Sequence, residues 1–409
     1  MAIISPFRAL RPQPALASKV ASLPYDVLNS AEAKASAGNN PYSFLHITKA
    51  EIDLPDETDI HSEKVYHKAE DNLFIFRNQK ILFKEEQPFY YIYQLTMNGR
   101  SQTGLVCVSA VADYEKDIIK KHELTRPEKE QDRINHIRIT GAQTGNVFLA
   151  FKSYKPFSDL INSWKKTHPP VYDFIAEDGI GHVIWVVDKP QIIQQISDIF
   201  KKEIPFTYIA DGHHRAASAA KVKYAQGDKA SPEADYFLTT LFPSDELQIL
   251  DYNRVVKDLN GLKPTEFLEK LNKDFRVEQT STAFSPGHLH TFGMYLEGNW
   301  YRLEAKQETY RNDPIGILDV TILQENILRP LLAIGDPGTD NRIDFVGGIR
   351  GLTELEKRVD SGNMKVAFSL YPVSMDQLFN IADSGQIMPP KSTWFEPKLR
   401  DGLLTHLIR

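Results

Sequence analysis

The sequence predicts a mixed α+β protein built from more than one unit. At 409 residues, the chain is longer than a single hydrophobic core usually supports. Runs rich in β-branched and aromatic residues alternate with amphipathic helical patterns along its length. We therefore expect an amino-terminal unit at 1–85 that wraps around a core at 86–260, followed by a carboxy-terminal α+β unit at 261–409.

The first unit contains short patterns, and the core opens with a clear strand pair. The first unit has a Pro-rich start, the turn-like stretch SLPYDVL, an Ala-rich segment from Ser30 and a helical pattern in HSEKVYHKAEDNLFIF. In PFYYIYQLTMNGRSQTGLVCVSAVADY, two runs of strand-forming residues flank Asn98 and Gly99. Asn-Gly is the dipeptide that most favours a tight hairpin turn, so this stretch predicts two paired strands.

The next stretch of the core predicts a helix. We expect it to start in the S/T-x-x-E style at Thr125, Pro127 and Glu128. We expect it to end near Gly141.

On this helix, polar residues follow one another at helical spacing. Lys129, Arg133, His136 and Thr140 lie four, three and four residues apart, so they form one polar stripe. Such a stripe is either a solvated face or a face turned towards a ligand.

The remaining elements follow from hydrophobic periodicity. The rest of the core should contain the strand GHVIWVVD, the helix QIIQQISDIFKKE, the strand FTYIA, the helix AASAAKVKYA and a hairpin in DYFLTTLFPSDELQILDYNRVV. The last unit should contain the helix PTEFLEKLNKDF, a hairpin in HTFGMYLEGNWYRLEAK turning at Gly298-Asn299, the helix LDVTILQENILRPLL, the loop GDPGTDNRIDFVGG and the strand MKVAFSLYPV.

Composition excludes several classes of protein. A net charge of -6, from 48 basic and 54 acidic residues, makes nucleic acid an unlikely main partner. The one cysteine, Cys107, allows neither an internal disulfide nor a zinc site built on several thiolates. Pro6 and Arg8 come too early for a signal peptide, and no apolar run reaches the roughly eighteen residues of a membrane helix. We expect a cytoplasmic protein without a membrane partner.

The stretch FTYIADGHHRAASAAKVKYA concentrates chemically useful residues between a strand and a helix. A helix amino terminus there presents unpaired N–H groups and the positive end of the helix dipole, which attract anions. Gly212 allows a close approach of backbone to ligand, and Arg215 offers a two-pronged contact to phosphate. His213 and His214 can donate hydrogen bonds or carry protons, and Asp211 can cap the helix, bind metal or orient a partner.

Three interpretations of this turn remain open. The first is a phosphate or nucleotide site. The second is a structural turn, in which Asp-Gly forms a common turn and Asp211 caps the helix. The third is a histidine-metal site. The chain has no G-x-x-x-x-G-K-[ST] loop and no G-x-G-x-x-G fingerprint, so a bound nucleotide would need another architecture.

Several of these stretches resemble known families. ADGHHRAASAA resembles the box of the ParB/sulfiredoxin-like superfamily, and above all the form found in its free-serine kinases. That box also resembles a large bacterial family of ParB-like conserved proteins of unknown function, together with PYDVL, HELTRPEKEQDR, LDVTILQENIL, GTDNRIDFVGG and MPPKSTWFEPKLRDGL. The resemblance implies a ParB/sulfiredoxin-like α/β core in the middle of the chain, Mg²⁺ and a nucleotide (ATP or ADP) as cofactors, and serine or phosphoserine as substrate.

The resemblance also assigns roles. By position, Glu123 matches the kinases' catalytic base, with Asp26 as the alternative base, and His122 and His213 complete the catalytic candidates. The phosphate- or nucleotide-binding candidates are Asp211, Gly212, His214, Arg215, Lys129 and Arg133.

Two other functions compete with a serine kinase. A nucleotide-independent phosphoserine phosphatase would use the same residues, since some relatives are thought to serve serine biosynthesis, where phosphoserine is converted to serine. A ParB-like nucleotide-dependent switch would bind DNA, which the acidic balance of the chain disfavours.

Overall fold

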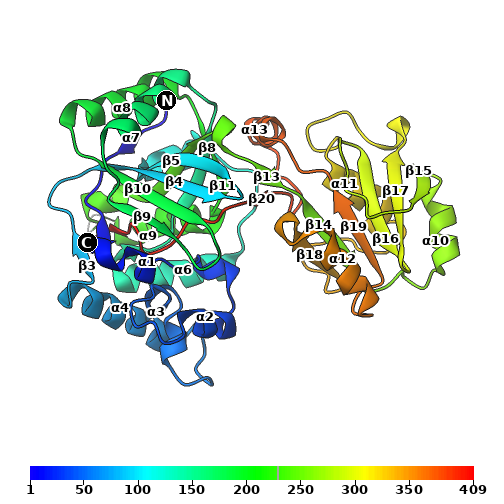
Figure 1. Cartoon of the computed structure of the whole chain (residues 1–409), viewed down its shortest axis with the longest axis horizontal. Helices are drawn as coiled ribbons and strands as arrows, with labels where there is room; N and C mark the ends of the chain where they lie inside the picture. The colour runs from blue at the N-terminus through cyan, green and yellow to red at the C-terminus, as the bar shows by residue number, and fades with distance from the viewer. Residues whose placement is uncertain (228–229) are drawn as a thin grey trace. The chain divides into compact units, whose positions relative to one another are not determined.

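The computed structural model describes residues 1–227 and 230–409 and divides the chain into two compact units (Figure 1). Unit 1 comprises residues 1–247 and 397–409, and unit 2 comprises residues 248–396. The structure thus has no boundary near residue 85, and unit 2 starts at 248 rather than 261. It also returns the end of the chain to unit 1, so that unit 2 is an insertion in unit 1.

Unit 1 is built on a mixed nine-stranded sheet, and the protein as a whole is mixed α+β. The strand order is β6-β11-β8-β12-β5-β4-β10-β9, with β1 paired to β5. Their bounds are β1 Ile4–Ser5, β4 Tyr90–Met97, β5 Arg100–Ala110, β6 Ile119–Lys120, β8 Val147–Phe151, β9 Tyr172–Ile175, β10 Gly181–Val187, β11 Thr207–Asp211 and β12 Tyr236–Pro243. The unit's helices are α1 Ala17–Val20, α2 Ser30–Ala37, α3 Leu45–Thr48, α4 Glu63–Asn78, α5 Val111–Glu115, α6 Pro127–Thr140, α7 Lys155–Thr167, α8 Pro190–Glu203 and α9 His213–Gln226.

The hairpin predicted at Asn98-Gly99 is confirmed. Strands β4 and β5 pair antiparallel, with Met97 opposite Arg100. Asn98 has φ 51° and Gly99 has φ 79°, as a two-residue turn of the primed type requires. The turn chemistry of two residues therefore sets the register of this strand pair.

The hairpin predicted in DYFLTTLFPSDELQILDYNRVV is wrong. Strand β12 is hydrogen-bonded on one side to β5 and on the other to β8, so it has no free edge for the strand that follows. That strand, β14 (Tyr252–Val256), pairs with β18 and β19 in unit 2 instead. The apolar run of β12 is explained by its central position, since both its faces are covered.

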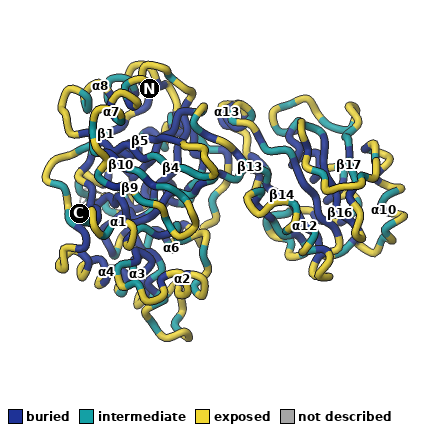
Figure 2. Tube along the Cα trace, in the orientation of Figure 1, coloured by how far each residue is buried: buried dark blue, intermediate teal, exposed yellow. Residues whose placement is uncertain are grey.

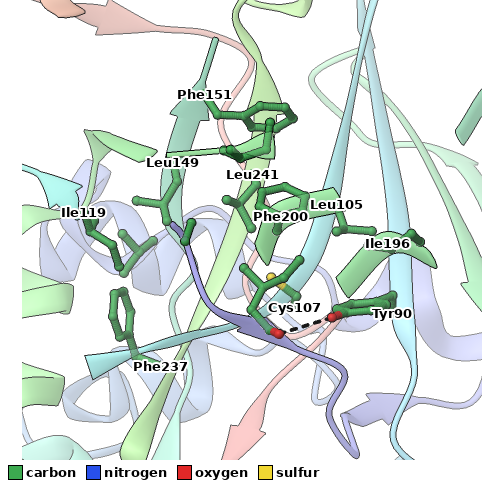
Figure 3. Packing of buried hydrophobic residues seen from close by; sticks show 14 of the residues in the cluster. Tyr90, Leu105, Cys107, Ile119, Leu149, Phe151, Ile196, Phe200, Phe237 and Leu241 are labelled. Atoms are coloured by element: carbon green, nitrogen blue, oxygen red, sulfur yellow. Dashed lines mark hydrogen bonds between the residues drawn. The ribbon is translucent and has the colours of Figure 1, made fainter. Parts of the chain in front are cut away.

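The core of unit 1 lies between the sheet and helices that include α7 and α8. Figure 3 shows Tyr90, Leu105 and Cys107 of the sheet close to Ile196 and Phe200 of α8. All five side chains are buried. Burial raises the pKa of the Cys107 thiol to about 12, so the thiol stays protonated at neutral pH.

Helix α6 begins at Pro127, as predicted, but the capping arrangement expected around Thr125 is wrong. The N-cap position is Arg126, and no side chain caps it. The helix ends at Gly141, which adopts a left-handed φ of 67°. The hydroxyl of Thr125 instead bonds the carboxylate of Glu130.

Most of the polar stripe on α6 is buried rather than solvated. Arg133, His136 and Thr140 are buried, whereas Lys129 is exposed. The Nε2 of His136 lies 3.0 Å from the carbonyl oxygen of Ile47, and α6 packs against α4. Burial lowers the pKa of His136 to about 4, so the imidazole is neutral.

The end of the chain is tied into unit 1 at several places. Ser22 and Asp401 exchange backbone hydrogen bonds, as do Leu10 and Thr405. Strand β21 (His406–Leu407) pairs with β7 (Ala142–Gln143), and β2 (Leu10–Pro12) pairs with β3 (Leu82–Lys84). The segment 397–409 therefore completes the unit that holds the predicted site.

Unit 2 is a second mixed α+β unit. Its six-stranded sheet has the order β15-β17-β16-β19-β14-β18, and β13 (Ile249–Leu250) pairs with β20 (Trp394–Phe395). The other bounds are α10 Pro264–Leu271, β15 Phe275–Thr280, β16 Thr291–Leu296, β17 Asn299–Ala305, α11 Asp319–Leu323, β18 Ile343–Gly347, α12 Gly351–Asp360, β19 Val366–Leu370 and α13 Met375–Asp383. The hairpin β16–β17 turns at Glu297-Gly298, one residue earlier than predicted. Figure 2 shows buried backbone along the sheets of both units, and none of the described helices is long and apolar enough to cross a membrane.

Candidate functional site

The turn between β11 and α9 combines features that favour anion binding. The strand ends at Asp211, and Gly212 turns the chain with a left-handed φ of 96°. The Cβ position of Gly212 lies 3.4 Å from the Cα of Val147 and from Nη1 of Arg215, so a side chain there would touch both. No side chain caps α9, so its first N–H groups remain available at the positive end of the helix dipole.

Glu123 and His213 meet beside this helix end. The Nδ1 of His213 lies 3.8 Å from a carboxylate oxygen of Glu123. The backbone N–H of His122 donates to the Nε2 of His213 at 3.5 Å, which assigns the proton of the neutral ring to Nδ1, facing Glu123. The side chain of Glu123 is 43% exposed and that of His213 only 5%, so the carboxylate is the open member of the pair.

The two histidines of this cluster are neutral. Burial lowers the pKa of His122 to about 4. Burial, together with the neighbouring His122, holds the pKa of His213 well below its ordinary value. The rings of the two residues meet edge to face with centroids 4.6 Å apart. At neutral pH these imidazoles can orient a partner but carry no positive charge to offer a phosphate.

Asp211 carries the negative charge nearest to the turn, and Lys398 neutralises it. Burial opposes ionisation of Asp211, but Lys398 and Arg215 outweigh it and hold the pKa of this carboxyl well below its usual range. The ammonium of Lys398 lies 3.0 Å from the carboxylate. Lys398 comes from the returning segment, so it reaches the site from the far end of the chain.

The guanidinium of Arg215 lies beside Gly212, where it is hydrogen-bonded to other parts of unit 1. One Nη donates to the carboxylate of Asp26 at 2.8 Å, and the other donates to the carbonyl oxygen of Asn146. Its Nε is buried and has no hydrogen-bond partner among the described residues. The expected two-pronged contact with a phosphate would therefore require the ion pair between Arg215 and Asp26 to break.

The other predicted cations divide between the interior and the surface. Arg133 is buried, paired with Asp132 at 2.6 Å and stacked 3.8 Å from the ring centroid of Tyr25. Lys129 is exposed. The Nε2 of His214 accepts the backbone N–H of Arg126 at 2.9 Å, which ties the start of α9 to the start of α6.

Around Arg215 the structure is closed. Tyr25, Arg133, Gly145 and Arg215 help to line a cavity of about 20 Å³, which is the size of one water molecule rather than a phosphate. Asp26, the alternative base, is held here by its pair with Arg215. We call the packed region around Arg215, Asp26 and Arg133 the closed side of the turn. We call the region around Glu123 and the amino end of α9 the open side.

Sequence reasoning missed Lys398, Asn146 and Asp401. Asp401 is buried beside Arg215 and Asp26, and burial raises its pKa to about 8. The only available signal was the stretch MPPKSTWFEPKLRDGL, which contains Lys398 and Asp401 but was assigned to the last unit. No group of three or more potential metal ligands occurs among the described residues.

Comparisons with known proteins found weak similarities to solved structures and one family. A free serine kinase in complex with AMP is similar with a TM-score of 0.36 and 13% identity, covering 68% of this chain and 84% of that one. A conserved hypothetical protein from Pyrococcus furiosus reaches 0.35 at 14% identity, covering 70% and 90%, and C-terminally truncated SbnI from Staphylococcus aureus reaches 0.32 at 12%, covering 73% and 86%. A search of curated proteins found no match. Residues 4–321 match the family described as protein of unknown function DUF1015, so the chain belongs to the DUF1015 family.

Proposed function

We propose that unit 1 is a phosphoryl-transfer enzyme that acts on the hydroxyl of free serine or on O-phosphoserine, with Mg²⁺ and a nucleotide (ATP or ADP). We further propose that its core is of the ParB/sulfiredoxin-like type. The observation that carries the proposal is the uncapped amino end of α9 lying beside the Glu123–His213 pair. An anion site and a candidate proton acceptor therefore meet at one turn.

The phosphoryl group would bind at the amino end of α9. The first N–H groups of this helix have no partner within the helix, and a phosphate oxygen accepts such groups well. Gly212 adds no side chain of its own at that point, and it adopts a left-handed φ that other residues rarely take. This arrangement needs no phosphate loop of the common type.

Glu123 would act as the base. The hydroxyl oxygen of serine attacks phosphorus, and its proton passes to Glu123 as that bond forms. The bond from phosphorus to the bridging oxygen breaks at the same time, and its electron pair leaves with the nucleotide, which is one phosphate shorter. In the reverse direction phosphoserine gives its phosphoryl group to the nucleotide and a proton returns to serine.

His213 would hold Glu123 in position. Its Nδ1–H faces the carboxylate, and its own position is fixed by the N–H of His122. Asp26 suits the role of base less well, because its carboxylate is paired with Arg215.

Magnesium would enter with the nucleotide. Mg²⁺ is commonly bound by one or two carboxylates together with phosphates and water, so it needs no protein cage. Asp211 is the ionised carboxylate next to the phosphate position and would supply a protein ligand. The metal would neutralise charge on the transferring phosphoryl group.

A phosphorus NMR assay tests this function. The full-length protein is incubated with Mg²⁺ and either serine plus ATP, ADP or pyrophosphate in turn, or phosphoserine with and without ADP. The proposal predicts that the phosphoserine signal grows or decays only when a nucleotide is present. Release of inorganic phosphate from phosphoserine alone would replace it with the phosphatase alternative, and no conversion under any condition would refute both.

A further inference from the structure

We infer that Lys398 is the cation that contacts the phosphoryl group at the amino end of α9. This inference rests on the proposed function and assigns to Lys398 the part that the sequence suggested for Arg215. It also makes the returning segment 397–409 part of the site.

The first argument comes from the partners of the other cations. Arg215 is held by Asp26 and Asn146, and Arg133 is held by Asp132 and stacked on Tyr25. Both guanidinium groups are buried among protein partners on the closed side of the turn. Each would have to break a buried ion pair to reach a ligand, and such a step is costly.

The second argument is the position of Lys398. Its ammonium is 3.0 Å from the carboxylate of Asp211, which directly precedes the glycine that begins α9. The side chains of Lys398 and Asp211 are 15% and 32% exposed, so the pair is sheltered but accessible to a ligand. An ammonium has three donors, so a bond to Asp211 is compatible with a bond to a phosphoryl oxygen.

The third argument is that the returning segment, which carries the lysine, is fixed within unit 1. Just beyond the lysine, Asp401 is bridged to Ser22, and further on β21 is paired with β7. A cation that is already positioned loses little freedom when it binds an anion, which favours phosphate binding.

The test compares the affinity for ADP with Mg²⁺, measured by titration calorimetry, in four full-length proteins. These are wild type, K398Q, K398R and the control K221M. Glutamine keeps a hydrogen-bond donor for Asp211 but removes the charge, and arginine keeps the charge. Lys221 also pairs with a carboxylate, that of Glu130, but lies two turns along α9 and is 60% exposed.

We expect K398Q to bind ADP at least about tenfold more weakly, a change that one charge-assisted hydrogen bond accounts for. K398R should recover part of the affinity, and K221M should bind like wild type. Urea unfolding of each variant separates loss of binding from loss of fold. If K398Q is too unstable to measure, K398R decides. A stable K398R that binds ADP more weakly than wild type supports the inference, and a K398R that binds ADP with full wild-type affinity overturns it.

The outcomes separate this inference from the proposed function. If wild type transfers phosphate and K398Q binds ADP as tightly as wild type, the role assigned to Lys398 is wrong but the proposed enzymatic function is retained. If K398Q binds ADP more weakly than wild type but wild type transfers no phosphate, the binding role of Lys398 is supported and the proposed reaction is wrong. If wild type binds neither ADP nor pyrophosphate, both fail.

Discussion

The turn at Gly212 has two sides that differ in how their charges are used. On one side, Arg215, Asp26 and Arg133 lie in a packed network with a cavity no larger than a water molecule. On the other side, Glu123 is 43% exposed and the amino end of α9 has no cap. The comparison teaches that charged residues around one turn can serve different ends: those on the closed side are paired with one another in the interior, and those on the open side are the ones for which we propose a ligand.

Replacing Glu123 by glutamine gives the largest expected effect and tests the open side. The amide keeps the size of the side chain but cannot accept the serine proton, so the turnover rate should fall by about 10²- to 10⁴-fold. ADP affinity should stay close to that of wild type, because Glu123 does not hold phosphate. Steady-state kinetics and calorimetry measure both, with E128Q on the exposed start of α6 as the matched control. Turnover that survives in E123Q would remove Glu123 from the mechanism.

Replacing Arg215 by methionine tests the closed side. The change removes the donor that pairs with Asp26 and with the carbonyl oxygen of Asn146, and both groups are left without it. The free energy of unfolding should therefore drop by about 3 kcal/mol. Urea unfolding measures the loss. A variant that unfolds like wild type but binds ADP poorly would show instead that Arg215 belongs to the phosphate site.

The buried carboxyl of Asp401 gives an effect that depends on pH. Burial raises its pKa in the folded protein to about 8, above the usual value for an unfolded chain, so the folded state holds the proton more tightly. Its contribution to stability is complete below about pH 4 and is lost as pH rises towards 8, by up to about 1.4 kcal/mol per pH unit. Asparagine does not titrate, so D401N should gain stability relative to wild type between pH 5 and pH 8.

Urea unfolding of both proteins at the two pH values measures this difference. A difference between wild type and D401N that does not change with pH would contradict the raised pKa of Asp401.

Lys129 should give the smallest effect. It is exposed on the first turn of α6, where a charge is solvated, so K129Q should change ADP affinity by less than about twofold. The same calorimetric titration measures it. A tenfold loss would place Lys129 at the ligand and extend the open side onto α6.

Local chemistry predicted much of the fold. The β4–β5 hairpin follows from Asn98-Gly99, and α6 begins at Pro127 and ends at Gly141 because these residues suit a helix start and end. The turn from β11 into α9 was also predicted, since a glycine between an apolar run and a helical run marks it. In each case, residues adjacent in sequence determine the structure.

Contacts between distant segments could not be predicted in the same way. Asp26 and Arg215 are 189 residues apart, and Lys398 and Asp211 are 187 apart. Strand β12 appeared to lead into a hairpin because nothing local shows that both its edges are already paired. Residues 397–409 follow unit 2 in the sequence but belong to unit 1, and no local pattern indicates this. Lys398 and Asp401 were therefore assigned to the wrong unit.

A crystal structure of the protein with ADP and Mg²⁺ tests the central claim most directly. The account predicts a phosphate of ADP within hydrogen-bond distance of the backbone N–H groups of His213 and His214, with the ammonium of Lys398 beside it. Phosphates bound elsewhere, with the amino end of α9 covered by protein side chains, would contradict it.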